Sequence, residues 1–182
     1  MARIALLTPA AHNPYVRIWR PAFDRLTAAL SGAGLEVVST EWPKAAEVEA
    51  DAVLPLLAWG YHQDAADWLA MLDDIETRGV TAINPAGVLR WNTTKTYLAD
   101  LEAAGVPVVP TVFADRVDDA VVAAARAELG GGTLVVKPQI SGGSHETVRL
   151  EPGEPLVGGP GGAAMIQPFL PSVSGEGEIS LL

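Results

Sequence analysis

The 182-residue chain contains no cysteine, which excludes disulfides and thiolate metal sites and fits a cytoplasmic protein. It also lacks a long apolar run. The longest such run, residues 52–59, is far shorter than the roughly 20 residues that a membrane-spanning helix needs, so we expect no membrane partner. The apolar segment after Met1 is short and is interrupted by Pro9, which favours a first strand over a signal peptide.

Basic residues are scarce. Twelve Lys and Arg stand against 22 Asp and Glu, the net charge is −10, and no stretch clusters the positive charges. Nucleic acid needs a basic face to neutralise its phosphates, so we exclude that partner. Only three residues are lysines, namely Lys44, Lys95 and Lys137. Lysine carries a compact charge on a flexible stem, which suits phosphate contact, so these few positions are informative.

The first half of the sequence alternates between strand and helix patterns. Apolar runs at residues 3–8 and 35–40 predict buried strands, and helical spacing at 21–33 and 64–78 predicts amphipathic helices. A third strand is expected at 52–57, at an edge because of Pro55, and a short fourth strand at 81–84. This order predicts parallel pairing in a doubly wound α/β layer.

Ligands of such sheets bind beyond the carboxyl ends of the strands. The loops that follow the first and third strands therefore supply candidate substrate residues, which are Asn13, Tyr61 and His62. A lone histidine in a loop, such as His12 or His62, is more often a surface or packing residue than a catalytic one. The acidic group at residues 73–76 matches the polar face of a helix and no metal-binding loop.

The second half begins with a helical region at 85–105, in which Trp91 is an apolar position and Asn92 a candidate helix cap. An extended segment at 106–113 is broken by prolines. The remaining expected elements are a helix at 118–129 ended by glycines, strands near 134–137 and 147–150, a Gly/Pro-rich surface loop at 151–162, and strands at 163–167 and 178–182.

The stretch from 134 to 150 reads as a strand, a glycine turn at Ser141–Ser144, and a second strand, with Lys137 at the mouth of the turn. Glycines let the backbone approach a ligand, so that successive N–H groups can converge on phosphate oxygens. An ordinary hairpin with a solvent-facing lysine explains the same local pattern equally well.

Four segments in order, at residues 91–95, 105–111, 135–144 and 165–181, resemble the ATP-grasp superfamily. The resemblance is to the branch that holds glutathione synthetases, ribosomal-protein glutamate ligases and the cyclo-ligase of D-cycloserine biosynthesis. It implies an α/β fold with an N-terminal doubly wound domain, an α+β flap subdomain, and a C-terminal ATP-grasp half that is missing or truncated. The implied boundaries are 1–90 for the N-terminal domain, 91–110 for a linking helix and loop, 111–166 for the flap, and 167–182 for the hinge and the start of the C-terminal subdomain.

The resemblance also assigns roles to residues of the second half. Lys95 and Lys137 would contact the nucleotide phosphates, and the turn at 141–144 would close over them. The hinge would hydrogen-bond the adenine edge, and Glu178 would accept from the ribose hydroxyls, although an exposed strand end explains Gln167 and Glu178 as well. The implied ATP-binding residues are Lys95, Lys137, Ser141, Gly142, Gly143, Ser144, Gln167, Phe169, Leu170 and Glu178.

The implied chemistry is ATP-dependent joining of a small-molecule carboxylate to an amine through an acyl phosphate, with ATP and Mg²⁺ as cofactors. The family's Mg²⁺ ligands are expected beyond Leu182, and no catalytic or metal-ligating residue is assigned within this chain. The final apolar run stops at Leu182, which predicts that further sequence comes after it. A homodimer is expected from the family. Two alternatives stay open, namely a non-catalytic nucleotide-binding module without the metal half and an unrelated α/β binding protein.

Overall fold

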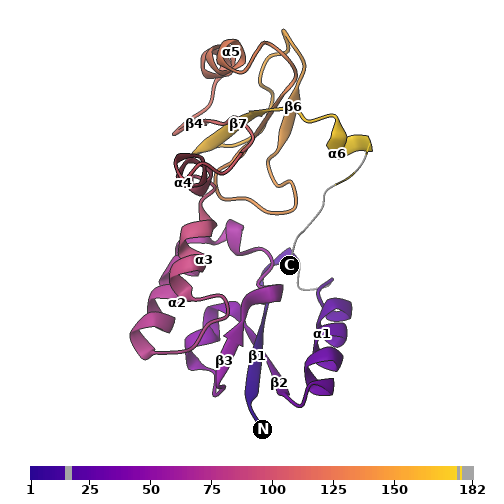
Figure 1. Cartoon of the computed structure of the whole chain (residues 1–182), viewed down its shortest axis with the longest axis vertical. Coiled ribbons are helices and arrows are strands. Elements are labelled where there is room, and N and C mark those ends of the chain that lie inside the picture. The colour runs from indigo at the N-terminus through magenta and orange to yellow at the C-terminus, as the bar shows by residue number, and fades with distance from the viewer. Residues whose placement is uncertain (15–17, 176, 178–182) are drawn as a thin grey trace. The chain divides into compact units, whose positions relative to one another are not determined.

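The computed structural model describes residues 1–14, 18–175 and 177, and it divides into two compact units, Met1–Thr94 and Lys95–Leu182 (Figure 1). The chain is mixed α/β, as the sequence predicts. None of the helices in the described ranges is long and apolar enough to cross a membrane. The finer boundaries expected within the second unit stay predictions.

The first unit is built on a three-stranded parallel sheet of order β2-β1-β3, formed by β1 (Arg3–Thr8), β2 (Glu36–Glu41) and β3 (Ala52–Leu54). The parallel pairing that the strand–helix–strand order predicts is confirmed. β1 is the central strand, and its residues from Ile4 to Thr8 are all buried. A strand that is covered on both faces reads as a continuous apolar run, which is what the sequence has here.

Helices lie on both sides of this sheet, with α1 (Arg20–Gly32) on one side and α2 (Ala65–Arg78) on the other (Figure 1). The predicted stripe of α2 is confirmed, because Trp68, Leu72 and Ile75 are buried in one cluster with alternate residues of β1. Gly79 ends α2 in the left-handed conformation, with φ of 66°, which glycine adopts without strain. Among the described residues, this unit also contains the short 3-10 helices η2 (Trp42–Glu47), η3 (Pro55–Leu57) and η4 (Tyr61–Gln63).

Three predictions of secondary structure were wrong in detail. The third strand ends at Leu54, because Pro55 fixes its own φ and starts a 3-10 helix instead of continuing the ladder. The fourth strand is reduced to one bridge between Val53 and Ala82. The helical region at 85–105 is two helices, α3 (Ala86–Thr93) and α4 (Tyr97–Ala103).

Two residues of that region also differ from expectation. Asn92 lies inside α3 and caps neither helix, since the residue before α4 is Thr96 and makes no side-chain cap. Trp91 is 45% exposed and is therefore not a core position. The buried positions of α3 are Ala86 and Thr93, seven residues apart on one face, and Trp91 lies on a different face of that helix.

The second unit contains a four-stranded antiparallel sheet of order β4-β7-β5-β6. The strands are β4 (Val112–Ala114), β5 (Leu134–Pro138), β6 (Val148–Leu150) and β7 (Ala164–Pro168). Its helices are α4, α5 (Asp119–Glu128) and α6 (Ser172–Gly175). Asp118 caps α5, because its carboxylate accepts from the Val121 N–H at 2.9 Å. The strand expected at 178–182 lies outside the described residues.

The two faces of this sheet carry different residues. Leu134, Val136 and Ile166 are fully buried against Val122 and Ala125 of α5. Because side chains alternate along a strand, Val135 and Lys137 point to the opposite face, and the register that pairs Val135 with Gln167 places Gln167 there too. We call this opposite side the open face.

Candidate functional site

A depression of about 450 Å³ lies on the open face of the second unit. It collects residues from five separate stretches of the unit, which is typical of a binding site built on a rigid sheet. The lining residues are Lys95, Val109, Val135, Lys137, Ser141, Gly142, Gly143, Ser144, Thr147, Gln167, Pro168, Phe169, Leu170 and Val173. Nine of the ten residues that the family resemblance assigns to ATP are therefore brought together, and the tenth, Glu178, lies outside the described residues.

The glycine turn follows directly from β5. Its backbone is left-handed at Gly143, where φ is 59°, and also at Ser144 and Glu146, where φ is 60° and 49°. Non-glycine residues in this conformation cost of order 1 kcal/mol each. The turn is held by local bonds, in which the Ser141 hydroxyl donates to the His145 carbonyl at 3.2 Å and the His145 N–H donates to Gly142. A strained turn of this kind is suited to move when a ligand binds.

Lys95 reaches this turn from the segment between α3 and α4. Its backbone N–H donates to the Gln139 carbonyl at 2.8 Å, and its ammonium Nζ donates to the Ser141 carbonyl at 2.9 Å. Burial lowers the pKa of Lys95, and the positive charge of Lys137 lowers it further. The fold thus brings two cations together at an electrostatic cost, which an anion between them would offset.

The hinge segment at 167–170 borders the depression on the strand β7. Gln167 is only 8% exposed, and its side-chain amide Nε2 donates to the Thr111 hydroxyl at 2.8 Å. The Phe169 N–H donates to the Thr133 carbonyl at 2.9 Å and so belongs to the sheet. Pro168 has no N–H, which leaves Leu170 as the backbone donor of this segment for a ligand.

Sequence reasoning missed the residues that support the hinge. The Arg149 guanidinium lies over the Phe169 ring, 4.0 Å from its centroid, and Arg149 Nη2 donates to Glu151 Oε1 at 2.7 Å. Glu151 Oε2 in turn accepts from the Thr133 hydroxyl at 2.6 Å. This hydrogen bond, together with Arg149, holds the pKa of Glu151 below its usual range. The four residues form a closed circuit, because Thr133 also binds the Phe169 N–H.

Nothing local in the sequence marks this circuit, because its members come from three different strands or strand ends. Only the observed register brings Val135 opposite both Arg149 and Gln167. The same holds for Thr111, which stands one residue before β4 and opposite Gln167 when the pairing of Val112 with Ile166 is continued. A hairpin predicted from the sequence indicates which residues of its two strands pair with each other. It does not indicate which third strand pairs with the hairpin.

The candidate substrate residues of the first unit are largely committed to internal contacts. Asn13 is 1% exposed, and its side-chain amide donates to the Gly60 carbonyl at 3.2 Å and to Gln63 at 3.3 Å. Gly60 cannot carry a side chain here, since a Cβ atom would lie 2.0 Å from the Asn13 amide nitrogen. Tyr61 stacks on Trp68 with 4.8 Å between ring centroids. Substrate contact by Asn13, Tyr61 and His62 stays a prediction.

A depression of about 390 Å³ lies at the carboxyl ends of β1 and β2 in the first unit, beside the loop after the first strand that the sequence predicts as a ligand-binding loop. It is lined by Thr8, Pro9, Ala11, Trp19, Arg20, Ser39, Thr40, Glu41 and Lys44. Lys44, the lysine not assigned to phosphate, is here, with its ammonium 3.6 Å from the Glu41 carboxylate. The topological rule for parallel sheets predicts this end of the strands, but not which side chains gather there.

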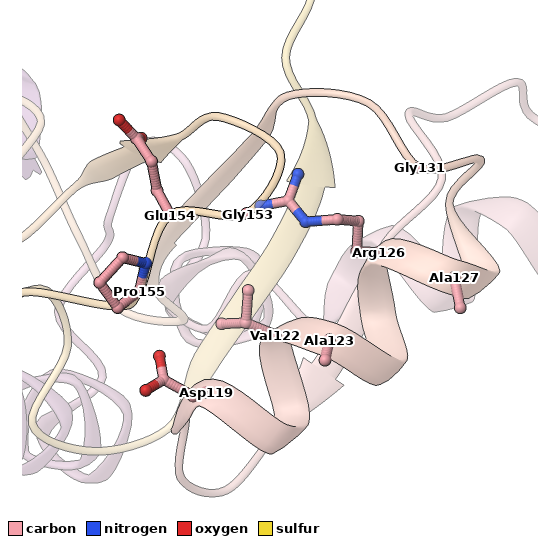
Figure 2. Close-up of a pocket in the computed structure, with 9 residues that line it drawn as sticks. All are labelled: Asp119, Val122, Ala123, Arg126, Ala127, Gly131, Gly153, Glu154 and Pro155. Atoms are coloured by element: carbon pink, nitrogen blue, oxygen red, sulfur yellow. The ribbon is translucent and has the colours of Figure 1, made fainter.

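The second unit has another depression, of about 580 Å³, beside α5 (Figure 2). Figure 2 shows Val122, Ala123 and Arg126 on the helix facing a loop that carries Glu154 and Pro155. Its one cation is already bound, because Arg126 donates to the backbone carbonyls of Gly132, Leu150 and Glu151. Because its arginine is already engaged, this hollow offers a ligand less chemistry than the depression on the open face.

Among residues 1–14, 18–175 and 177, no group of three or more His, Asp or Glu side chains is placed to hold a metal ion. The open-face depression instead offers two ammonium groups, a glycine turn and an amide-bearing hinge. Cations beside a turn of backbone N–H groups fit a polyphosphate, and a half-apolar hinge with polar edges fits a flat heterocyclic base.

In a comparison with known families, the model of the "D-cycloserine synthetase DcsG, N-terminal domain" matches residues 4–84. The curated cycloserine biosynthesis protein DcsG of Streptomyces lavendulae is 33% identical over 144 residues. That alignment includes 72% of this chain and 47% of the relative, so the chain spans about half the length of the curated protein that it matches.

Solved structures give the same result. The crystal structure of the D-cycloserine synthetase DcsG matches with a TM-score of 0.74 and 26% identity, over 96% of this chain and 62% of that one. D-alanine–D-alanine ligase from Bacillus anthracis matches with a TM-score of 0.62 and 16% identity, over 93% of this chain and 57% of that one. The second likeness is evidence of a shared fold only.

Proposed function

Because the chain belongs to the ATP-grasp superfamily, we propose that it supplies the N-terminal domain and the nucleotide-binding flap of an ATP-dependent carboxylate–amine ligase. One observation supports this most directly: two lysines, the glycine turn and the hinge line one depression on the open face. Two structural relatives carry names that refer to small-molecule products, a D-cycloserine synthetase and a D-alanine–D-alanine ligase. The substrates proposed here are accordingly a small-molecule carboxylate and a small-molecule amine.

The proposed reaction has two steps. An oxygen of the substrate carboxylate attacks the γ-phosphorus of ATP, which forms an acyl phosphate and releases ADP. The amine nitrogen then attacks the acyl carbon, expels inorganic phosphate and loses a proton, and the product is an amide or peptide-type bond. Negative charge spreads over the phosphoryl oxygens in the first step, so fixed cations and N–H donors stabilise that transition state.

The chain's own residues have separable roles in this proposal. Lys95 and Lys137 hold the phosphates, and the turn at 141–144 closes over them and excludes water. The Leu170 N–H and the Gln167 side chain bind the base edge. Glu178 would bind the ribose, although it lies outside the described residues.

Mg²⁺ is the usual partner of ATP in this superfamily, where it neutralises phosphate charge. The described residues do not fit a site for it, since they include no acidic cluster of the required kind. The roles proposed for this chain therefore do not involve the metal. This mismatch is what favours the second candidate, a nucleotide-binding module without ligase activity.

Limited proteolysis tests the nucleotide site. The strained turn at 141–146 should be cut readily in the free protein, and ATP should slow cleavage there roughly tenfold by ordering the turn around its phosphates. Cleavage in the loop at 151–162, which lies outside the depression, serves as the internal control. Equal cleavage of the turn with and without ATP would contradict the flap assignment.

A second assay separates the ligase from the binding module. Hydroxylamine captures acyl phosphates as hydroxamates, so we expect ATP-dependent hydroxamate formation when the protein is given a panel of amino acids and related small carboxylates. Binding of ATP together with no hydroxamate from any carboxylate, in a form of the protein that also carries Mg²⁺ ligands, would favour the module.

A further inference from the structure

We propose that Thr111 sets the base selectivity of the nucleotide site by fixing the orientation of the Gln167 side-chain amide. The inference rests on the nucleotide site proposed above and adds a residue that the family resemblance does not assign. Thr111 acts through Gln167, so its role is that of a positioning residue.

The Thr111 hydroxyl has already used its proton. It donates to the Val109 carbonyl at 2.7 Å. A hydroxyl has one proton, and a backbone carbonyl can only accept, so that proton is committed. The Thr111 oxygen is left as an acceptor.

The amide of Gln167 meets this acceptor. Its Nε2 lies 2.8 Å from the Thr111 oxygen and donates to it. The opposite orientation would place the amide oxygen against a hydroxyl oxygen with no proton between them. Gln167 is only 8% exposed, so water does not readily relieve that repulsion. The pair is also rigid, because the two residues stand opposite each other at the β4–β7 edge.

The fixed amide offers a ligand an acceptor. With Nε2 turned to Thr111, the amide oxygen Oε1 is the atom left for a base, and no described residue donates to it. Both Val109 and Gln167 line the open-face depression. An acceptor selects the 6-amino group of adenine and repels the 6-oxo group of guanine or hypoxanthine. The relay of hydrogen bonds from Gln167 through Thr111 to Val109 therefore favours an adenine nucleotide. It would favour a 6-oxopurine if the Gln167 amide were turned over.

The test begins with the unaltered 182-residue chain, labelled with ¹⁵N and titrated with three triphosphates while the amide shifts of Lys137 and Gly143 are followed. ATP carries an amino group at C6, purine riboside triphosphate carries hydrogen, and inosine triphosphate carries oxygen. We expect ATP to bind roughly five- to tenfold more tightly than the purine nucleotide, and inosine triphosphate to bind most weakly. Inosine triphosphate that binds as tightly as ATP would overturn the inference.

Variants then assign the selectivity to Thr111. Thr111→Val keeps the shape but removes the hydroxyl, so the amide can turn and the preference for ATP over inosine triphosphate should fall at least fivefold. Thr111→Ser keeps the hydroxyl and should restore the preference. Thr81→Val is the matched control, because Thr81 is exposed, belongs to the first unit and does not line the depression, so it should leave the preference unchanged.

The outcomes separate the two proposals. Wild-type preference retained in Thr111→Val, with nucleotide still bound, overturns the role of Thr111 and leaves the nucleotide site standing. No shift with any of the three triphosphates overturns the nucleotide site itself and this inference with it. If Thr111→Val does not fold, the nucleotide series and Thr111→Ser decide the question, since loss of the preference in Thr111→Ser contradicts the relay.

Discussion

The second unit has one hollow between α5 and a neighbouring loop and another on the open face of its sheet, and the two differ in the chemistry that they offer a ligand. Beside α5, a space of about 580 Å³ surrounds Arg126, whose donors are already bound by three backbone carbonyls. On the open face, a space of about 450 Å³ holds Lys95 and Lys137, whose mutual repulsion contributes to the lowered pKa of Lys95. Volume measures imperfect packing, whereas two like charges held close together at an electrostatic cost favour the binding of an anion. Substitutions on each side test whether one side stabilises and the other binds.

The largest effect is expected on the α5 side. Leu134→Ala removes a fully buried side chain and should lower the free energy of unfolding by about 3 kcal/mol, measured by urea denaturation. Val135→Ala, its neighbour on the open face, is half-buried and should cost about 1 kcal/mol, while it weakens nucleotide binding. Equal losses of stability would remove the distinction between the faces.

Lys137→Ala should have a large effect on ATP binding and a small effect on stability, the opposite of Leu134→Ala. Loss of a charge-assisted phosphate contact is expected to weaken ATP binding roughly 10- to 100-fold, while the free energy of unfolding changes by less than about 1 kcal/mol. Lys44→Ala, in the first unit, is the control and should leave ATP affinity unchanged. Isothermal titration gives the affinities. Unaltered ATP binding in Lys137→Ala would place the phosphates elsewhere.

As pH rises, the lowered pKa of Lys95 should weaken ATP binding but raise the stability of the fold. Its pKa lies below the ordinary lysine value of 10.5, so charging it in the folded protein is unfavourable. ATP affinity should fall roughly threefold to tenfold as pH rises through the lowered pKa, because the ammonium is lost. Stability should rise between that pKa and 10.5, because the unfolded chain binds the proton more tightly.

Lys95→Arg tests this assignment, since arginine stays protonated over the whole range. Both pH dependences should flatten in the variant, in titrations with ATP and in urea denaturation at matched pH values. An unchanged pH profile in Lys95→Arg would assign the titration to another group.

The smallest effect is expected at the support of the hinge. Arg149→Ala removes the guanidinium from the Phe169 ring and should weaken ATP binding roughly two- to threefold. Arg149→Lys keeps the charge and should recover part of that loss. The exposed Arg116 provides the control substitution. A larger loss in Arg149→Lys than in Arg149→Ala would argue against support through the ring.

Local patterns predicted much of what lies close in sequence. The β5–turn–β6 segment, the stripe of α2 and the cap after it all follow from apolar period, glycine and proline, and each is confirmed. The grouping of Lys95, Lys137 and the hinge followed from the family resemblance, since nothing local links them. The Thr111–Gln167 contact joins residues 56 positions apart and depends on β4 pairing with β7. The pattern of a single strand does not show which other strand it pairs with.

Because side chains alternate between the two faces along β5, the number of residues in this strand decides which side chains reach each face. One residue more or fewer between Leu134 and Lys137 would turn the lysine into the α5 core and bring an apolar side chain to the phosphates. Insertions of two residues preserve the sides but shift Lys137 along the strand by about 7 Å relative to the hinge. A substitution in β5 therefore affects one face of the sheet, whereas a change in the length of β5 displaces side chains on both faces. A library of single-residue deletions across the chain should find β5 among its least tolerant segments, for reasons of phase as much as of packing.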